Sequence, residues 1–140
     1  KKEQMAARIE AIAKRSKGIT VYCEDSLNLL KRCSEFLPKE SLIYLDPPYY
    51  VKGKGLYRNY YQHDDHVQIA TVLQQKKFKW PWVVSYDNVD EIRAMYQMSE
   101  ALSYGLNYTA QRRYMGNEVM FFSQGLMVPD EAIPQTKAAS

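Results

Sequence analysis

The feature that most constrains the fold is a short apolar run that ends at two consecutive prolines. Residues 42–45 (LIYL) are continuously apolar, which is typical of a strand buried on both faces of a parallel sheet. Pro47 and Pro48 come directly after Asp46 and cannot continue a sheet ladder, because proline has no N–H to donate. The sequence therefore predicts a buried strand that stops abruptly, with a carboxylate at its carboxyl end.

Helical and strand-like patterns alternate along the rest of the chain. The apolar spacing predicts helices over residues 2–17, 26–37, 65–73 and 89–96, and strands over residues 19–23, 42–45, 81–85, 106–114 and 119–122. Alternation of this kind indicates right-handed crossovers and an open, mostly parallel α/β sheet. The last two strands, with a turn at Gly116-Asn117, predict an antiparallel hairpin.

Polar residues ahead of the apolar periods mark where two of these helices begin. Asp25 is expected to cap the second helix. Asn88, with Glu91 three residues later, resembles a capping box for the fourth. In the third helix the residues expected to face inward are Val67, Ile69, Val72 and Leu73.

Composition narrows the class of protein. The chain has no run of about 18 apolar residues that could cross a membrane, and it shows no secretory signal. Its two cysteines have neither metal-ligand spacing nor a disulfide framework. A net charge of +3 permits nucleic-acid binding without arguing for it. We therefore expect a soluble, cytoplasmic domain with reduced thiols.

Ligands in open α/β sheets bind at the carboxyl ends of the strands. Three of the expected strand ends are polar: Glu24-Asp25-Ser26, Asp46-Pro47-Pro48-Tyr49 and Ser85-Tyr86-Asp87-Asn88. In the second of these, the Asp46 carboxylate and the Pro47 carbonyl offer two acceptors on a stiff backbone beside the Tyr49 ring. This combination suits the exocyclic amine of a planar base. Accepting both amine hydrogens localises the nitrogen lone pair for attack, and the benefit comes from preorganised electrostatics.

The run IYLDPPYY resembles the catalytic motif of the dam-type DNA adenine-N6 methyltransferases. Further segments resemble that family in the same order, over roughly residues 8–124: TVYCEDS, DHVQIATVL, PWVVSYDN and YTAQRRYMGNEVMFF. The resemblance implies a Rossmann-like methyltransferase sheet and transfer of a methyl group from S-adenosylmethionine to adenine N6 in DNA. The base would be flipped out of the duplex into the pocket.

The resemblance also implies roles for individual residues. Asp46 and the Pro47 carbonyl, held by Pro48, would accept from the target amine, and Tyr49 would stack on the flipped ring. Asp25 and Ser26, together with Asp46, would border the cofactor. A simple helix cap is the alternative interpretation of Asp25, and the two roles are compatible.

The sequence departs from the family in one respect. We find no Phe-x-Gly-x-Gly loop after a strand, and no lysine-containing segment ahead of it. We therefore expect residues 1–127 to be the C-terminal half of a catalytic domain, with residues 128–140 as a flexible tail. On this interpretation the missing half is a partner, the isolated chain self-associates, and it is inactive by itself.

Basic and aromatic residues interleave after the motif, which suits phosphate contact and base stacking. The predicted DNA contacts here are Tyr50, Lys52, Lys54 and Arg58, with Arg112 and Arg113 on the hairpin. A solvated loop and a protected sheet edge are the respective alternatives. His63 and His66 have no third ligand of evident spacing, so a polar helix start is favoured over a metal site.

Two other functions stay open at this stage. One is methylation of another planar amine or amide, in RNA, cytosine or protein glutamine. The other is a nucleic-acid-binding remnant without catalysis. The sequence is compatible with a prokaryotic or a phage-encoded protein and with a role in restriction-modification. It does not indicate which DNA sequence is recognised.

Overall fold

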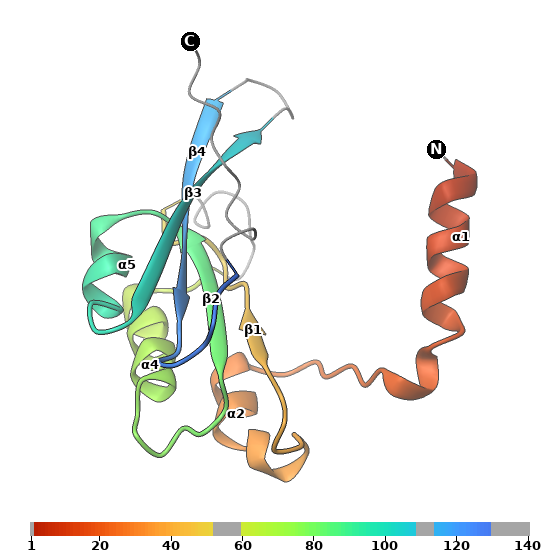
Figure 1. Cartoon of the computed structure of the whole chain (residues 1–140), viewed down its shortest axis with the longest axis horizontal. Coiled ribbons are helices and arrows are strands. Elements are labelled where there is room, and N and C mark those ends of the chain that lie inside the picture. Colours follow the sequence, from red (N-terminus) through yellow and green to blue (C-terminus); the bar gives the residue numbers. More distant parts are fainter. Residues whose placement is uncertain (1, 52–59, 109–113, 130–140) are drawn as a thin grey trace.

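The computed structural model describes residues 2–51, 60–108 and 114–129 (Figure 1). Its helical elements are α1 (Lys2–Ala13), η1 (Ser16–Gly18), α2 (Ser26–Lys31), η2 (Cys33–Glu35), α4 (His63–Leu73) and α5 (Asp90–Met95). The strands are β1 (Ile43–Leu45), β2 (Trp82–Asp87), β3 (Glu100–Tyr108) and β4 (Tyr114–Phe122). Among these ranges, no helix has the length and apolar character to cross a bilayer.

The four strands form one sheet in the order β1-β2-β4-β3. β1 pairs with β2 in parallel, whereas β4 pairs antiparallel with both β2 and β3. It follows that β1, β2 and β3 run in the same direction and that the reversed β4 is inserted between β2 and β3. The α/β class and the closing antiparallel hairpin are confirmed. The sheet is partly parallel, with β1–β2 as the parallel pair among the described strands.

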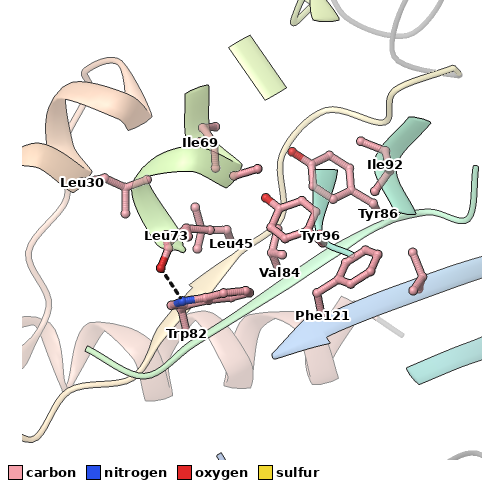
Figure 2. Packing of buried hydrophobic residues seen from close by; sticks show 12 residues of the cluster. Leu30, Leu45, Ile69, Leu73, Trp82, Val84, Tyr86, Ile92, Tyr96 and Phe121 are labelled. Atoms are coloured by element: carbon pink, nitrogen blue, oxygen red, sulfur yellow. Dashed lines mark hydrogen bonds between the residues drawn. The ribbon is translucent and has the colours of Figure 1, made fainter. Parts of the chain in front are cut away.

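The core lies between the sheet and the helices α2, α4 and α5 (Figure 2). Alternate residues of β2, namely Trp82, Val84 and Tyr86, are fully or almost fully buried and point to the same face of the sheet. Ile69 of α4 and Ile92 of α5 pack against them. The ends of α4 and β2 are also joined by a hydrogen bond, which the Trp82 indole N–H donates to the Leu73 carbonyl at 2.9 Å.

The strand expected over residues 19–23 does not form. Ile19 has extended backbone angles, but no described strand pairs with this segment. Val21 is 86% exposed. β-branched residues favour a strand only where a neighbouring strand completes the ladder and covers the side chains, so this prediction was wrong for the structure as described.

The first helix forms as expected but contributes nothing to the core. α1 ends at Ala13, and η1 continues to Gly18. No residue of α1 is buried, and the apolar stripe of Met5, Ile9 and Ile12 is more than 60% exposed. Figure 1 shows α1 standing apart from the sheet, joined to it by an extended stretch of chain.

The helix starts were predicted with mixed success. Asp25 caps α2 as expected, whereas α5 begins after Val89, and that residue makes no side-chain cap. The Asn88 side-chain oxygen instead accepts a 2.6 Å hydrogen bond from Arg93 Nε. A capping box does occur at α4, between Gln62 and Asp65.

Within the helices, the inward positions were mostly right. Ile69 and Leu73 of α4 are buried, and Val72 packs against the core. Val67 was expected to face inward but is 37% exposed. Ile92 of α5 and Tyr96, the residue that follows the helix, are fully buried.

The closing hairpin is longer than predicted, and its turn lies elsewhere. β3 begins at Glu100, six residues before the expected start, and Gly116 pairs with Leu106 inside β4. The turn at Gly116-Asn117 was therefore wrong, because both residues belong to the ladder. The connection between the strands falls in residues 109–113, outside the described part, as do residues 130–140 of the expected tail.

Candidate active site

The carboxyl ends of β1 and β2 lie at the same edge of the sheet, because the two strands are parallel. Asp46 follows β1 directly and is exposed. The buried Ser85 hydroxyl of β2 donates a 2.9 Å hydrogen bond to Asp46 Oδ1. The aspartate of the predicted motif is therefore open to solvent while one of its oxygens is held by the neighbouring strand.

A second hydroxyl extends this contact. Tyr44 Oη lies 3.0 Å from Ser85 Oγ. A serine hydroxyl has one hydrogen, so when Ser85 donates to Asp46, Tyr44 must be the donor to Ser85. The result is a short chain of hydrogen bonds that runs from Tyr44 through Ser85 to the Asp46 carboxylate.

Asp87, the last residue of β2, holds the chain that follows the motif. Its Oδ1 accepts from the Tyr50 N–H at 2.8 Å, and its Oδ2 accepts from the Val51 N–H at 2.9 Å. The Asp87 side chain is almost fully buried, with 6% of the residue exposed. Both oxygens of a buried carboxylate are thus satisfied by consecutive backbone donors, as the burial of a charge requires.

Glu118 of β4 holds the ring of the motif tyrosine. Its Oε1 accepts from the Tyr49 hydroxyl and its Oε2 from the Tyr104 hydroxyl, each at 2.8 Å. Glu118 is 6% exposed and stands directly opposite Asp87 in the β2–β4 ladder. Two buried carboxylates from neighbouring strands therefore contact consecutive parts of the same segment.

The ring of Tyr50 packs against two histidines of α4. Its hydroxyl lies 2.9 Å from His63 Nδ1, and its ring centroid lies 5.3 Å from that of His66. His66 is fully buried, and its Nδ1 lies 3.0 Å from the Tyr86 hydroxyl. Burial lowers the pKa of His66, and the nearby Asp65 and Asp87 carboxylates offset part of this effect. The two histidines act here as packing and hydrogen-bonding groups around Tyr50.

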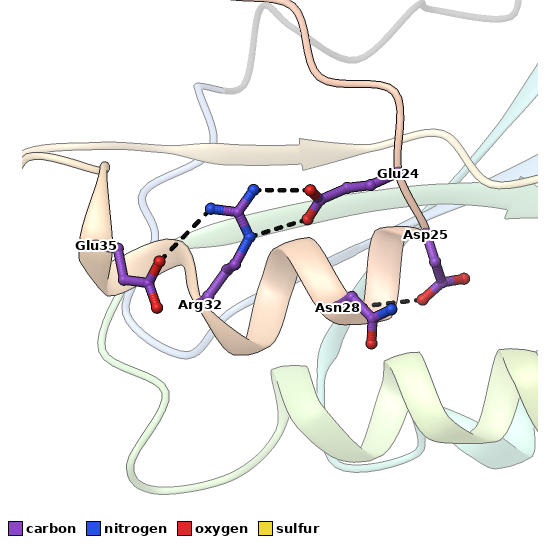
Figure 3. Close-up of polar contacts among 5 residues, drawn as sticks. All are labelled: Glu24, Asp25, Asn28, Arg32 and Glu35. Atoms are coloured by element: carbon purple, nitrogen blue, oxygen red, sulfur yellow. Dashed lines mark hydrogen bonds and ion pairs between the residues drawn. The ribbon is translucent and has the colours of Figure 1, made fainter.

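The residues predicted to border the cofactor lie at the start of α2. Asp25 Oδ1 accepts from the Asn28 N–H at 3.1 Å, which is the helix cap shown in Figure 3. The Ser26 hydroxyl is hydrogen bonded to the Tyr61 hydroxyl, and the Tyr61 ring lies 5.4 Å from that of His66. Through Tyr61, the start of α2 is connected to the aromatic group that surrounds Tyr50.

The start of α2 is fastened to its end by an ion pair (Figure 3). Arg32 donates to both carboxylate oxygens of Glu24, at 3.0 and 2.7 Å. The hydrogen bond from Arg32 lowers the pKa of Glu24. Glu24 immediately precedes the capping residue Asp25, so the ion pair holds the chain at the point where it enters α2.

The other predicted DNA contacts cannot be placed. Lys52, Lys54, Arg58, Arg112 and Arg113 lie outside the described residues. Of the predicted set, the structure therefore brings together Asp46, Tyr49 and Tyr50 at the carboxyl edge of the sheet, with Pro47 and Pro48 between them in the chain.

A cavity in the described ranges lies away from these residues. It measures about 670 Å³ and is lined by residues that include Leu30, Cys33, Val72, Phe78 and Trp80. These residues come from α2, η2, α4 and the connection that leads into the amino end of β2, the edge opposite Asp46. None of its lining residues is a predicted site residue. Across the same ranges, no group of three or more His, Cys, Asp or Glu side chains could hold a metal ion.

Comparison with known proteins decides the family. A family model for D12 class N6 adenine-specific DNA methyltransferases matches residues 1–111. The chain belongs to this family. No curated protein matches the chain in a direct sequence search.

Membership of the D12 methyltransferases confirms the resemblance seen in the motif. It shows a transferase class that methylates DNA and is specific for adenine. Enzymes of this kind generally use S-adenosylmethionine as the methyl donor. The match also covers α1 and the exposed segment after it, so these belong to the family region although no residue of α1 is buried.

Three polar residues of the candidate site were given no role by the sequence. Ser85 and Asp87 were recognised as part of a polar strand end, but no role followed, because their partners lie 36 to 39 residues away in the chain. Glu118 was missed altogether. The signal for it is a single carboxylate beside the apolar run of residues 119–122, where a buried charge requires hydrogen-bond partners.

Proposed function

We propose that this protein methylates the exocyclic N6 amine of adenine in DNA at the carboxyl edge of its sheet. The observation that carries the proposal is the placement of Asp46. In a chain of the D12 family, its carboxylate is exposed at the end of β1, and Ser85 holds one of its oxygens. An oriented carboxylate next to a rigid proline backbone suits the activation of an aromatic amine.

Asp46 and the Pro47 carbonyl accept the two hydrogens of the target amine in this proposal. Because both acceptors are held before the substrate arrives, they need no reorganisation when positive charge develops on the nitrogen. When bound, S-adenosylmethionine would supply the methyl group and leave as S-adenosylhomocysteine, and the nitrogen that receives the methyl group would release one proton to solvent. The Asp46 carboxylate stabilises the nitrogen while that proton is still attached.

Tyr49 provides the stacking surface for the target base. Its hydroxyl is bonded to Glu118, so the ring has a fixed orientation before a base arrives. An adenine inside a duplex cannot reach Asp46, and enzymes that act on a base take it out of the stack. We therefore include base flipping in the proposal, with Tyr50 and the basic residues 52, 54 and 58 next to the flipped nucleotide.

Asp25 and Ser26 are the proposed cofactor contacts. Asp25 is exposed and uses Oδ1 for the helix cap, and a carboxylate has further lone pairs for amine or hydroxyl donors. These acceptors thus fit the amine and hydroxyl donors of the adenosine part of S-adenosylmethionine. The sequence has no Phe-x-Gly-x-Gly turn. Asp25 and Ser26 are therefore proposed as contacts of the adenosine part alone, and no residue is assigned to the rest of the cofactor.

A Rossmann-like sheet is proposed as the scaffold. Its support is the common direction of β1, β2 and β3 with the reversed β4 among them. The division at residue 127, the inactivity of the isolated chain and its self-association stay predictions.

Replacement of Asp46 tests the function. In the full-length protein, Asp46→Ala should lower kcat for adenine methylation by about 10²- to 10³-fold, which corresponds to about 2.7–4 kcal/mol of lost transition-state stabilisation. Because Asp46 is exposed, the thermal midpoint should stay unchanged. Asp90→Ala removes a carboxylate that is also exposed, in the first turn of α5, and should leave kcat intact. Near-normal turnover by Asp46→Ala at saturating cofactor and DNA would exclude the proposed role.

A further inference from the structure

Two residues of β2 hold the segment that carries the motif. Ser85 and Asp87 are two positions apart on the strand, so their side chains point to the same side of the sheet, opposite Tyr86. Ser85 is 4% exposed and Asp87 is 6% exposed. Their hydrogen bonds end on Asp46 and on the backbone of Tyr50 and Val51, that is, on both sides of the two prolines.

We propose that Ser85 and Asp87 are positioning residues, which together clamp the segment 46–51 and set the geometry of the Asp46 carboxylate. Neither residue touches the base in this proposal. The inference about the reaction rests on the proposed function, whereas the clamp itself is a property of the folded chain. The clamp consists of one hydrogen bond to a side chain and two to consecutive backbone amides.

The prolines explain why such a clamp is needed. Pro47 and Pro48 have no N–H, so the backbone that leaves β1 cannot be fastened by donors at these positions. The Asp87 carboxylate takes the amides of Tyr50 and Val51, just beyond the prolines. Hydrogen bonds to an ionised acceptor are roughly twice as strong as neutral ones. A buried carboxylate can therefore restrain a segment that its own backbone does not restrain.

Ser85 completes the clamp on the other side of the prolines. Its hydroxyl donates to Asp46 Oδ1, which fixes the rotation of the carboxylate and leaves Oδ2 for the target amine. The Tyr44 hydroxyl, 3.0 Å from Ser85 Oγ, keeps the serine hydrogen directed at Asp46. A carboxylate free to rotate would spend part of its time with neither oxygen aligned, and misalignment at a reacting centre lowers the rate.

The kinetic test uses Ser85→Ala and Asp87→Asn in the full-length protein. Ser85→Ala removes one hydroxyl, and Asp87→Asn keeps the shape but replaces one acceptor by an amide donor. Each should lower kcat about tenfold, the lower end of what losing an outer-shell partner costs at metal sites. KM for DNA and for S-adenosylmethionine should stay within about twofold, because a group that acts only in the transition state lowers kcat without changing KM.

Matched controls separate positioning from folding. Ser123→Ala removes a serine oxygen that accepts from the backbone N–H of Trp82, at the amino end of β2. Asp90→Asn neutralises an exposed aspartate of α5. Both should leave kcat unchanged, even where the thermal midpoint falls. If Ser123→Ala lowers kcat as much as Ser85→Ala does, the effect is structural and the positioning role of Ser85 is wrong.

Amide hydrogen exchange tests the clamp without any catalytic readout. In Asp87→Asn, exchange of the Tyr50 or the Val51 amide should be about tenfold faster than in Asp90→Asn, while the amide of Val84 in the centre of β2 keeps its rate. Loss of a hydrogen bond worth about 1.4 kcal/mol gives a tenfold change in a local opening equilibrium.

The two failures can be told apart. If the protein does not methylate adenine but the exchange result holds, the proposed function is wrong and the clamp stands. If both amides exchange at wild-type rates in Asp87→Asn, the clamp is wrong whatever the activity. If the protein methylates adenine and Ser85→Ala leaves kcat unchanged, then Ser85 does not set the geometry of the Asp46 carboxylate.

Discussion

The N-terminal segment, residues 2–24, and the α/β body, the described residues from 25 to 129, use similar apolar side chains in opposite ways. Every residue of the N-terminal segment is exposed. Ile12 of α1 has 61% of its surface exposed, whereas Ile92 of α5 has 0%. Both isoleucines lie in helices of the same chain, but only Ile92 is buried by neighbouring elements.

The difference separates local preference from packing. α1 has the helical spacing and the alanine content that favour a helix by themselves, and it forms without any buried residue. α5 has only six residues, too few to be stable alone, and its Ile92 is held against β2 and β4 in the core. The short helix α5 buries a side chain, whereas α1 has only its spacing and composition to favour it.

The two regions meet at a small cluster at the end of the N-terminal segment. The guanidinium carbon of Arg32 lies 5.5 Å from the ring centroids of Tyr22 and of Phe36, and the two rings lie 5.0 Å apart. Glu24 is paired with the same arginine. Fixed contacts to the body therefore begin near residue 22.

The sharpest test of the comparison exchanges the same residue type in both regions. Ile92→Ala should lower the free energy of unfolding by about 2–5 kcal/mol, because it leaves a cavity in a closed core. Ile12→Ala, in the exposed α1, should change it by less than about 0.5 kcal/mol. Urea denaturation of both variants measures the difference. Equal losses would show that α1 packs against the protein in solution, and the comparison would be broken.

A buried titratable group makes the stability of the body depend on pH. The pKa of His66 lies below its ordinary value of 6.5 because burial disfavours the imidazolium. The unfolded chain therefore binds a proton that the folded chain does not. Protonation of His66 in the unfolded chain therefore destabilises the folded protein. This loss of stability is absent well above pH 6.5, and it grows as pH falls from 6.5 to the lowered pKa of the folded state.

The expected slope has a matched control. Between pH 6.5 and 5.5 the free energy of unfolding should fall by up to about 1 kcal/mol on account of His66. Denaturant titrations at several pH values should show this slope in the wild type and in His63→Gln, since His63 is exposed. The slope should shrink in His66→Gln. An identical slope in His66→Gln would contradict the assignment.

Replacement of Asp25, the residue that caps α2, tests how much the start of the body contributes to stability. Asp25→Ala removes the acceptor of the Asn28 N–H and should lower the free energy of unfolding by about 1 kcal/mol. Asp25→Asn, which keeps a capping oxygen, should recover most of the loss. In the full-length protein, KM for S-adenosylmethionine should rise in Asp25→Ala if the residue also contacts the cofactor. An unchanged KM would reduce Asp25 to a cap.

The smallest expected effect lies at the junction itself. Arg32→Gln removes the hydrogen bond that lowers the pKa of Glu24, so this pKa should return toward its ordinary value. Carboxyl NMR titration measures the change, with Lys31→Gln as a control on the neighbouring position. Because both partners are exposed to water, the thermal midpoint should hardly move. A Glu24 pKa that is the same in Arg32→Gln and the wild type would mean that the pair does not form in solution.

Local chemistry made much of the molecule predictable. The strand before Asp46 and its abrupt end follow from an apolar run and two prolines, and the start of α2 follows from one capping residue. The motif itself was enough to indicate the family that the comparison then showed. These features depend on residues that are neighbours in the chain, so their effect can be derived from the sequence by itself.

Tertiary structure decided which segments pair and which side chains hold the motif. The apolar segment 19–23 has strand propensity but finds no partner among the described strands. The hairpin ladder extends through Gly116, which pairs with Leu106 of β3. Glu118 and Tyr49 are 69 positions apart in the chain, and Asp87 and Tyr50 are 37 apart. A buried carboxylate is tolerated only where folding delivers donors to it, and donors so distant in the chain are brought there by the sheet alone.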